Sequence, residues 1–487
     1  MKDIILTTIN AKWIHPSLAL RLLKANLGSL EDRCEIIEFA LRQPLNEKIQ
    51  MLLEAKPRIL GISVSIWNHA QTIELLQELE KSWASDRIHR VKPFVVLGGP
   101  EVSYLPSYAE IFKYADYVIR GEGETSFRIL CENILHIENH LFQPVAQDNI
   151  FNKQVNINKL KSAYHLYTDE DLSKKLIYAE ASRGCVFHCE FCSSSIDSRL
   201  REFPLEPFLA EMDQLIRRGV KTIKFLDRSF NTNIKRAVQI MEFLLNQIEL
   251  QTSSVSPCMN SSANISPFAV HFEMAPSLFP PELRETLARF PQGTLRLEIG
   301  IQSLNPDICA LTGRVSNPEK ELEALRFLRS KTNAIIHADL IAGLPGEDIV
   351  SFGNGFDRLW NALNSASDDV PQNGTGQQRF EIQPGILKLL PGTRISRHTE
   401  LFGMRFNPQP PYEVTETSSI TASDINRLKN FARFWELIVN RRLIKLPGNK
   451  AVFNKFMEMS DSLYAHFGRN WGIDRAELQT KLNELKF

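Results

Sequence analysis

The chain has 487 residues, 43% of them hydrophobic, and its 57 Lys and Arg balance 57 Asp and Glu, so the formal net charge is zero. At about 150 residues per domain this length predicts roughly three domains, and no apolar run approaches the ~20 residues of a membrane span. The balanced charge gives no electrostatic case for a nucleic-acid partner. The first residues show no signal-peptide pattern, so we expect a cytoplasmic protein with reduced thiols.

Residues 1–145 alternate short apolar runs with amphipathic helical periods. The runs predict strands at Ile4–Thr8, Cys34–Phe39, Ile59–Ile66, Phe94–Gly98 and Asp116–Arg120. Buried strands that alternate with helices imply a parallel sheet covered on both faces. We therefore predict an α/β domain of the doubly wound, flavodoxin-like type.

Residues 146–172 are polar and rich in Asn, which predicts a surface linker. A second βα series fills residues 173–400. Its predicted strands are Leu176–Ala181, Thr222–Leu226, Val270–Glu273, Leu295–Ile301, Ile335–Ile341 and Glu381–Leu389. Six consecutive units of this kind predict a partial (β/α)6 TIM barrel.

Two stretches within this series, residues 251–266 and 365–378, are rich in Ser, Asn, Gly and Pro and should be exposed loops. From residue 401 the pattern changes to long helical periods, at Ala422–Asn440 and Lys450–Phe467. Residues 401–487 therefore predict a small helical C-terminal domain.

Three of the seven cysteines, Cys185, Cys189 and Cys192, follow the first predicted barrel strand with C-x₃-C-x₂-C spacing. Three thiolates on one loop can hold three irons of a [4Fe-4S] cluster and leave the fourth iron open. With His188 they could instead hold structural zinc, although no second Cys/His pair at knuckle spacing accompanies them. A ferredoxin-type cluster would need a fourth nearby cysteine, usually followed by Pro.

This motif at the start of a βα barrel resembles the signature of radical S-adenosylmethionine (SAM) enzymes. The resemblance covers residues ~173–395 and implies that SAM binds the open iron. The matching SAM-binding positions are Phe191, Asp227, Arg228, Glu298, Gln302, Ser303, Ile341 and Leu389. Glu273 and Asp339 should point into the barrel mouth, as substrate contacts or as core carboxylates.

Leu97–Pro100 and Arg120–Glu124 resemble the cobalamin-binding domain that precedes the barrel in many radical SAM proteins. The implied cobalamin-binding residues are Asn10, Ser63, Ser65, Gly98, Gly99, Gly121 and Glu122. The Asp-x-His-x-x-Gly motif that supplies a cobalt ligand is absent, since Asn10–His15 takes its place. The fold could therefore also have lost the cofactor and serve as a docking module.

Together these resemblances imply a cobalamin-dependent radical SAM enzyme that methylates an unactivated carbon of a small, natural-product-type substrate. Its cofactors would be a [4Fe-4S] cluster, SAM and cobalamin, and its electron donor a flavodoxin or ferredoxin. A non-methylating radical reaction, such as ring closure, and a non-catalytic iron–sulfur or cobalamin sensor are the alternatives. An RNA methylthiotransferase fits less well, because residues 1–145 hold only two cysteines, Cys34 and Cys131.

Overall fold

The computed structural model describes residues 2–85, 92–136, 154–253, 267–364, 380–444, 446–448 and 450–485. The chain forms two compact units. Unit 1 comprises Met1–Ala181 and Arg201–Lys224, and unit 2 comprises Ser182–Leu200 and Phe225–Phe487. The predicted loop at 365–378, and nearly all of the one at 251–266, lie outside the described residues.

Unit 1 begins with a five-stranded parallel sheet of order β2-β1-β3-β4-β5. Its strands are β1 Ile4–Asn10, β2 Cys34–Ala40, β3 Ile59–Ser63, β4 Phe94–Gly98 and β5 Tyr117–Val118. This strand order confirms the predicted flavodoxin-like fold. The strands form because each is a short, nearly continuous apolar run, such as the fully buried Ile-Ile-Leu-Thr-Thr-Ile-Asn of β1.

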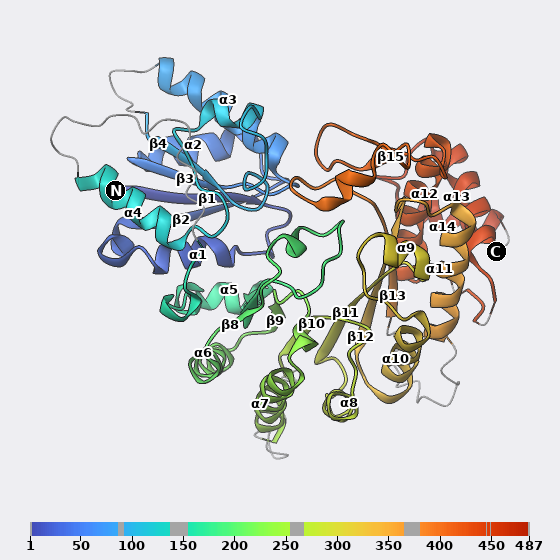
Figure 1. The fold of residues 1–487 in the computed structure, drawn as a ribbon. Coiled ribbons are helices and arrows are strands. Elements are labelled where there is room, and N and C mark those ends of the chain that lie inside the picture. Colours follow the sequence, from blue (N-terminus) through green and yellow to red (C-terminus); the bar gives the residue numbers. More distant parts are fainter. Residues whose placement is uncertain are drawn as a thin grey trace. The chain divides into compact units, whose positions relative to one another are not determined.

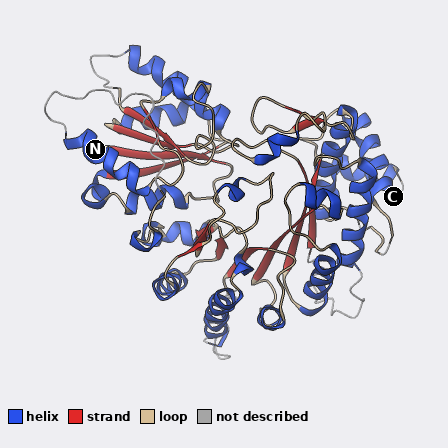
Figure 2. Ribbon diagram, in the orientation of Figure 1, coloured by secondary structure: helices blue, strands red, loops and turns tan. Residues whose placement is uncertain are grey.

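Helices cover both faces of this sheet, and each face has its own hydrophobic core (Figure 2). The helices are α1 Leu18–Ala25, α2 Leu45–Ala55, α3 His69–Ser85 and α4 Glu124–His136. Leu52 of α2 and Leu75 of α3 belong to one core, whereas Leu20 of α1 and Leu130 of α4 belong to the other. In folds of this kind the ligand site lies beyond the carboxyl ends of the strands.

The described part of the predicted linker is packed structure. Val155, Tyr164 and Tyr167 are buried, and the short helix α5 follows at Asp169–Lys174. Buried Arg21 of α1 pairs with Asp171 at 3.1 Å and lies 4.5 Å above the Tyr167 ring. The segment is thus an integral part of unit 1, which also contains β6 Ile177–Ala179, β8 Arg201–Glu202, α6 Leu205–Arg217 and most of β9 Thr222–Phe225.

Unit 2 contains a run of parallel barrel strands in the order β13-β12-β11-β10. They are β10 Ala269–Met274, β11 Leu295–Gln302, β12 Ile335–Ala342 and β13 Phe380–Ile386, preceded by the short β7 at Ser182–Arg183. The helices of this part are α7 Ile234–Ser253, α8 Pro281–Ala288, α9 Pro306–Leu311, α10 Pro318–Lys331 and α11 Ile349–Asn364. Alternating burial along β10, β11 and β12 gives each strand one fully buried face and one partly open face.

The C-terminal region packs on the barrel within unit 2, where α12 lies against β13 (Figure 1). Its elements are β14 Arg405–Phe406, β15 Val414–Glu416, α12 Ala422–Trp435, a π-helical turn at Glu436–Asn440, α13 Phe453–Phe467 and α14 Arg475–Glu484. Phe356 of α11 meets Phe431 and Trp435 of α12 edge to face, with ring centroids 5.1 and 4.7 Å away. Residues 401–487 and the barrel share this aromatic core and therefore form one compact unit.

Among the residues that the structure describes, no helix combines the length and apolarity that a membrane span requires.

Candidate active site

The cysteine loop begins with a sharp turn at Gly184. Its φ of +89° is a conformation that side chains rarely tolerate, and a Cβ there would lie 2.1 Å from the carbonyl oxygen of Arg199. The Cys185 amide donates to the Asp197 carbonyl at 3.2 Å, which closes the loop around the cysteines. Glycine at this position therefore lets the loop double back close to its own chain.

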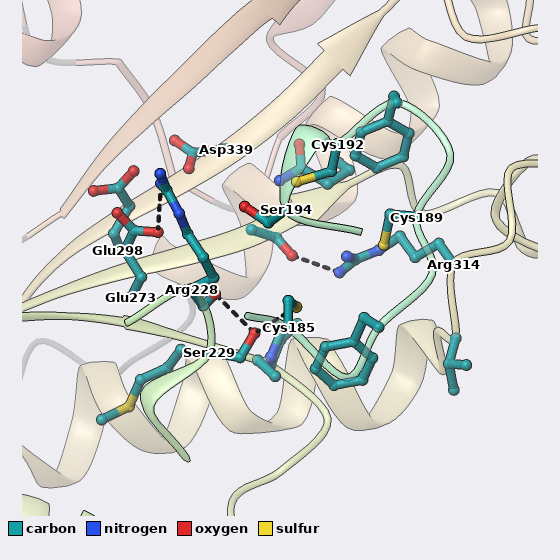
Figure 3. A pocket seen from close by; sticks show the side chains of 18 of the residues that line it. Cys185, Cys189, Cys192, Ser194, Arg228, Ser229, Glu273, Glu298, Arg314 and Asp339 are labelled. Carbon is teal, nitrogen blue, oxygen red and sulfur yellow. Dashed lines mark hydrogen bonds and ion pairs between the residues drawn. The ribbon is translucent and has the colours of Figure 1, made fainter. Parts of the chain in front are cut away.

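All three motif cysteines line one cavity of about 320 Å³ in unit 2. Figure 3 shows Cys185, Cys189 and Cys192 on the loop, with Arg228, Glu273, Glu298 and Asp339 on the far side of the cavity. Within the described residues, no three His, Cys, Asp or Glu side chains converge so as to hold a single metal ion. In a four-iron cluster the protein ligands are spread over separate irons, so the three thiols need not converge on one atom.

The strand ends supply the polar wall of this cavity. Glu273 of β10 lies directly beside Glu298 of β11 in the strand register, and the Arg228 guanidinium is 3.9 Å from Glu273. Asp339 of β12 lines the same space. Glu298 in turn lies 3.3 Å from His271 Nε2, so the neighbouring carboxylates of this wall have partners within the protein.

Arg314 is a cavity residue that the sequence patterns did not indicate. It follows α9, donates to the carbonyl of Gly300, and lies close to the Cys189 thiol. Burial raises the pKa of Cys189, and the charge of Arg314 opposes that effect. Fully buried Glu321 stands 3.9 Å from Arg314 on α10. A guanidinium beside the loop favours the thiolate form that an iron–sulfur ligand needs.

Glu190, which lies between Cys189 and Cys192 in the sequence, anchors the cysteine loop to other parts of unit 2. Its buried carboxylate pairs with the Arg397 guanidinium at 2.6 Å and with Nε2 of buried His398 at 2.8 Å. Its backbone amide donates to Thr312 O at 2.9 Å, and its carbonyl accepts from the Ile395 amide at 3.0 Å. We call Glu190, Arg397 and His398 the loop clamp.

A second cavity, of about 530 Å³, adjoins the first, since Phe191 and Leu390 line both. Five of the eight predicted SAM-binding residues line one or both of these spaces: Phe191, Arg228, Glu298 and Gln302 the first, and Phe191 and Ile341 the second. Gln302 has a φ of +66° at a β-bulge. This strained backbone aims a polar side chain at the cavity.

The other three predicted SAM contacts line neither cavity. Buried Asp227 accepts a hydrogen bond from Ser182 Oγ, and Ser303 Oγ donates to Glu347 at 2.7 Å. Leu389 is also absent from both linings, whereas its neighbour Leu390 is present. Asp227 and Ser303 therefore hold strand ends in place, and their contact with SAM stays a prediction.

The predicted cobalamin residues gather at the carboxyl edge of the sheet in unit 1. Asn10 donates to Glu38 at 3.0 Å, Ser63 pairs in register with Gly98, and the amide of buried Ser65 donates to Asn68. A Cβ at Gly98 would meet only the carbonyl oxygen of Ile119, at 3.6 Å, so no clash requires glycine at this position. Contact of these residues with cobalamin stays a prediction.

Other residues of this edge have structural partners. Gly99 has a φ of +100°, and a Cβ there would lie 2.6 Å from the Val64 carbonyl. The Gly121 amide donates to Ser103 Oγ at 2.9 Å. Glu122 pairs with Arg201 at 2.7 Å. Cobalamin contacts by Gly121 and Glu122 remain predictions, and they would add to these bonds.

His15 hydrogen-bonds the Tyr178 hydroxyl through Nδ1 at 2.9 Å and stacks against that ring. Burial lowers its pKa. Nothing in this arrangement provides the cobalt ligand that the missing Asp-x-His motif would supply.

Comparisons with known proteins identify two domains in the chain. The family model of the radical SAM superfamily matches residues 180–357, and that of the B12 binding domain matches residues 4–131. The chain thus contains a radical SAM domain and, before it, a B12-binding domain.

Its curated relatives include methyltransferases. An uncharacterized methyltransferase of Pyrococcus horikoshii is 25% identical over 281 residues, which cover 52% of this chain and 55% of the relative. TokK of Streptomyces tokunonensis, a cobalamin-dependent radical SAM methyltransferase, is 24% identical over 346 residues, which cover 66% of this chain and 47% of TokK. The chain spans about half the length of these relatives.

Solved structures share the fold. OxsB, a cobalamin-dependent SAM radical enzyme solved with aqua-cobalamin and SAM bound, matches with a TM-score of 0.64 and 17% identity, over 99% of this chain and 74% of OxsB. TsrM of Kitasatospora setae, solved with cobalamin and a [4Fe-4S] cluster bound, matches with a TM-score of 0.57 and 16% identity, over 84% of this chain and 78% of TsrM.

Proposed function

We propose that the protein is a cobalamin-dependent radical SAM methyltransferase that acts on an unactivated carbon of a small organic molecule. One observation carries this proposal: three thiols of a single loop line a cavity at the ends of parallel barrel strands, in a chain that also has a B12-binding domain. The fold and the methyltransferase relatives support it.

Cys185, Cys189 and Cys192 would hold three irons of the cluster, and the strand ends at Ser63 and Gly98 would contact the cobalamin tail. When bound, the cluster supplies the electron that cleaves SAM, and cobalamin carries the methyl group. Three cysteines would leave one iron without a protein ligand, and the cavity that they line would give the amine and carboxylate of SAM access to it.

The side chains around the cavity bind and orient the ligands. Arg314 donates toward the Cys189 sulfur and keeps positive charge beside the cluster site. The loop clamp fixes the direction of the cysteine loop. Arg228, Glu273 and Asp339 offer hydrogen bonds and charge to the methionyl group of SAM or to the substrate.

A flavodoxin or ferredoxin is the proposed electron donor, because the cluster needs an electron to cleave SAM. The cytoplasm is the proposed compartment, because thiols stay reduced there.

The first prediction concerns SAM cleavage by the anaerobically reconstituted chain, loaded with iron, sulfide and cobalamin. With SAM and dithionite, wild type should release 5′-deoxyadenosine, and Cys189→Ala should reduce the rate at least 100-fold, since one cluster ligand is lost. Chromatography of the quenched reaction measures both.

Cys309→Ala is the matched control, because Cys309 is also buried but lies outside the motif. Wild type that forms no deoxyadenosine, or Cys189→Ala that keeps wild-type activity, would contradict the proposal. Deoxyadenosine without S-adenosylhomocysteine would favour a non-methylating radical reaction instead.

A further inference from the structure

Unit 1 contains a buried histidine–carboxylate pair at the carboxyl edge of its sheet. His69 is the first residue of α3, and Glu101 follows β4. Nδ1 of His69 lies 2.8 Å from Oε1 of Glu101, and the two side chains are only 10% and 3% exposed. Neither residue is among the predicted cobalamin contacts.

The hydrogen bond to Glu101 fixes the state of the His69 ring. An ionised carboxylate can only accept a hydrogen bond, so Nδ1 of His69 carries the proton. The other ring nitrogen, Nε2, then holds a lone pair in the neutral ring. Solvent reaches Nε2, which has no hydrogen-bond partner within the described residues. His69 therefore offers a free donor atom at the surface of the sheet edge.

Hydrogen bonds hold the pair beside the end of β1, where the missing Asp-x-His motif would begin. Asn68 is fully buried and donates from Nδ2 to the Ile9 carbonyl at 3.0 Å. The Glu101 amide donates to the Val64 carbonyl at 3.1 Å, which holds the carboxylate on the other side of β3. Because His69 directly follows Asn68, it lies close to the segment that replaces the motif.

Large aromatic side chains are exposed at the same edge. Trp67, which comes shortly before His69, is 52% exposed, and Trp13, from the loop after β1, is 49% exposed. The Trp67 indole is held by a hydrogen bond from Nε1 to the Ile9 carbonyl at 3.2 Å. Large apolar side chains exposed at one edge of a domain are typical of ligand or partner sites. The flat indole rings suit the face of a large macrocycle.

We propose that His69 is an axial ligand of the cobalt and that Glu101 positions its ring. This inference rests on the proposed function, because it requires bound cobalamin. The corrin ring supplies the other nitrogen ligands of cobalt, so the protein has to add only a single donor atom. Imidazole suits transition metals, and a carboxylate on its other nitrogen orients the ring and raises its basicity. The pair would thus perform the role of the missing motif from another loop.

The test is electron paramagnetic resonance of cob(II)alamin bound to the full-length protein labelled with nitrogen-15 histidine. The unpaired electron of cobalt(II) couples to an axial nitrogen, so a nitrogen-15 ligand splits each cobalt line into a doublet. The benzimidazole of cobalamin itself is unlabelled and would give a triplet, and the absence of a nitrogen ligand would give unsplit lines. We expect the doublet.

His69→Gln assigns the signal to this residue. It should remove the doublet and weaken cob(II)alamin binding by about tenfold or more, as measured by absorbance titration. His15→Gln is the matched control and should keep both the doublet and the affinity, because His15 bonds the Tyr178 hydroxyl instead of a carboxylate.

Variants of Glu101 test its positioning role. Glu101→Ala should weaken cob(II)alamin binding roughly tenfold. Glu101→Gln should recover most of the affinity and keep the doublet, because its amide oxygen can still accept from Nδ1. A carboxylate that only supported the fold would leave the affinity of both folded variants equal to that of wild type.

A triplet or unsplit lines from labelled wild type would overturn the inference without any variant, and so would a doublet that survives in His69→Gln. Failure of the proposed function would show separately, as wild type that gives the doublet but forms no deoxyadenosine with SAM and dithionite.

Discussion

At the scale of single residues, Glu347 is an unusual carboxyl group. It lies buried after β12, accepts from Ser303 Oγ at 2.7 Å, and no cation pairs with it within the described residues. Burial raises its pKa to about 7, against hydrogen bonds from Ser303 and Ser351 that lower it. The folded protein therefore holds a proton here that the unfolded chain releases near pH 4.5.

Because the pKa of Glu347 is higher in the folded state, its ionisation should lower the free energy of unfolding progressively as the pH rises from about 4.5 to 7. Above pH 7 the full loss should be present. The free energy of unfolding of Glu347→Gln minus that of wild type should therefore increase with pH. Between pH 5 and pH 8 the increase should be on the order of 2 kcal/mol. Urea denaturation across this range measures the difference.

Exposed Glu458→Gln is the control, and its difference from wild type should not change with pH. A constant difference for Glu347→Gln would mean that this carboxyl ionises normally in the folded protein.

Sequence motifs identified the residues that act through local spacing and missed those that act across the fold. The three cysteines were evident because they lie within eight residues of one another. Arg314 was not evident, because it lies far from Cys189 in the sequence and comes close to it only where the chain leaves α9. His398 and Arg397 meet Glu190 across more than 200 residues of sequence, which no local pattern can reveal.

At the scale of elements, the loop clamp ties the cysteine loop to the short 3-10 helix Arg394–His398 that follows the last barrel strand. Removing the buried carboxylate would leave His398 and Arg397 without this acceptor, at a cost of about 1–3 kcal/mol. Glu190→Ala should therefore lower iron and sulfide per chain after reconstitution at least threefold, whereas Glu190→Gln should retain more.

The measurement is colorimetric iron and sulfide analysis with the electron paramagnetic resonance signal of the reduced cluster. Glu206→Ala, an exposed carboxylate at the start of α6, serves as control. Full cluster loading with an unchanged signal in Glu190→Ala would show that the loop keeps its shape without the clamp.

Elements with long, regular hydrophobic patterns were predictable. The strands of the front sheet and β10 to β13 appear within a few residues of their predicted bounds. The short α9, the β14–β15 pair and α14 were missed, because two to ten residues of weak periodicity give little signal. The packing of residues 154–172 was also hidden, since its buried residues are scattered among polar ones.

At the scale of the whole molecule, one chain carries two ligand-binding folds. Sequence predicted both folds, because each has strand and loop signatures of its own. It did not predict that the C-terminal helices share a core and a cavity with the barrel, since these depend on which side of α12 meets β13. The proposed function requires both cofactors to serve one methyl transfer.

The most direct test is the fate of a labelled methyl group. The reconstituted protein would be incubated anaerobically with methyl-deuterated SAM and reductant, and its cobalamin and nucleoside products analysed by mass spectrometry. We expect methylcobalamin that carries the deuterated methyl group, together with S-adenosylhomocysteine and 5′-deoxyadenosine. Deoxyadenosine from a protein whose cobalamin never acquires the label would contradict it.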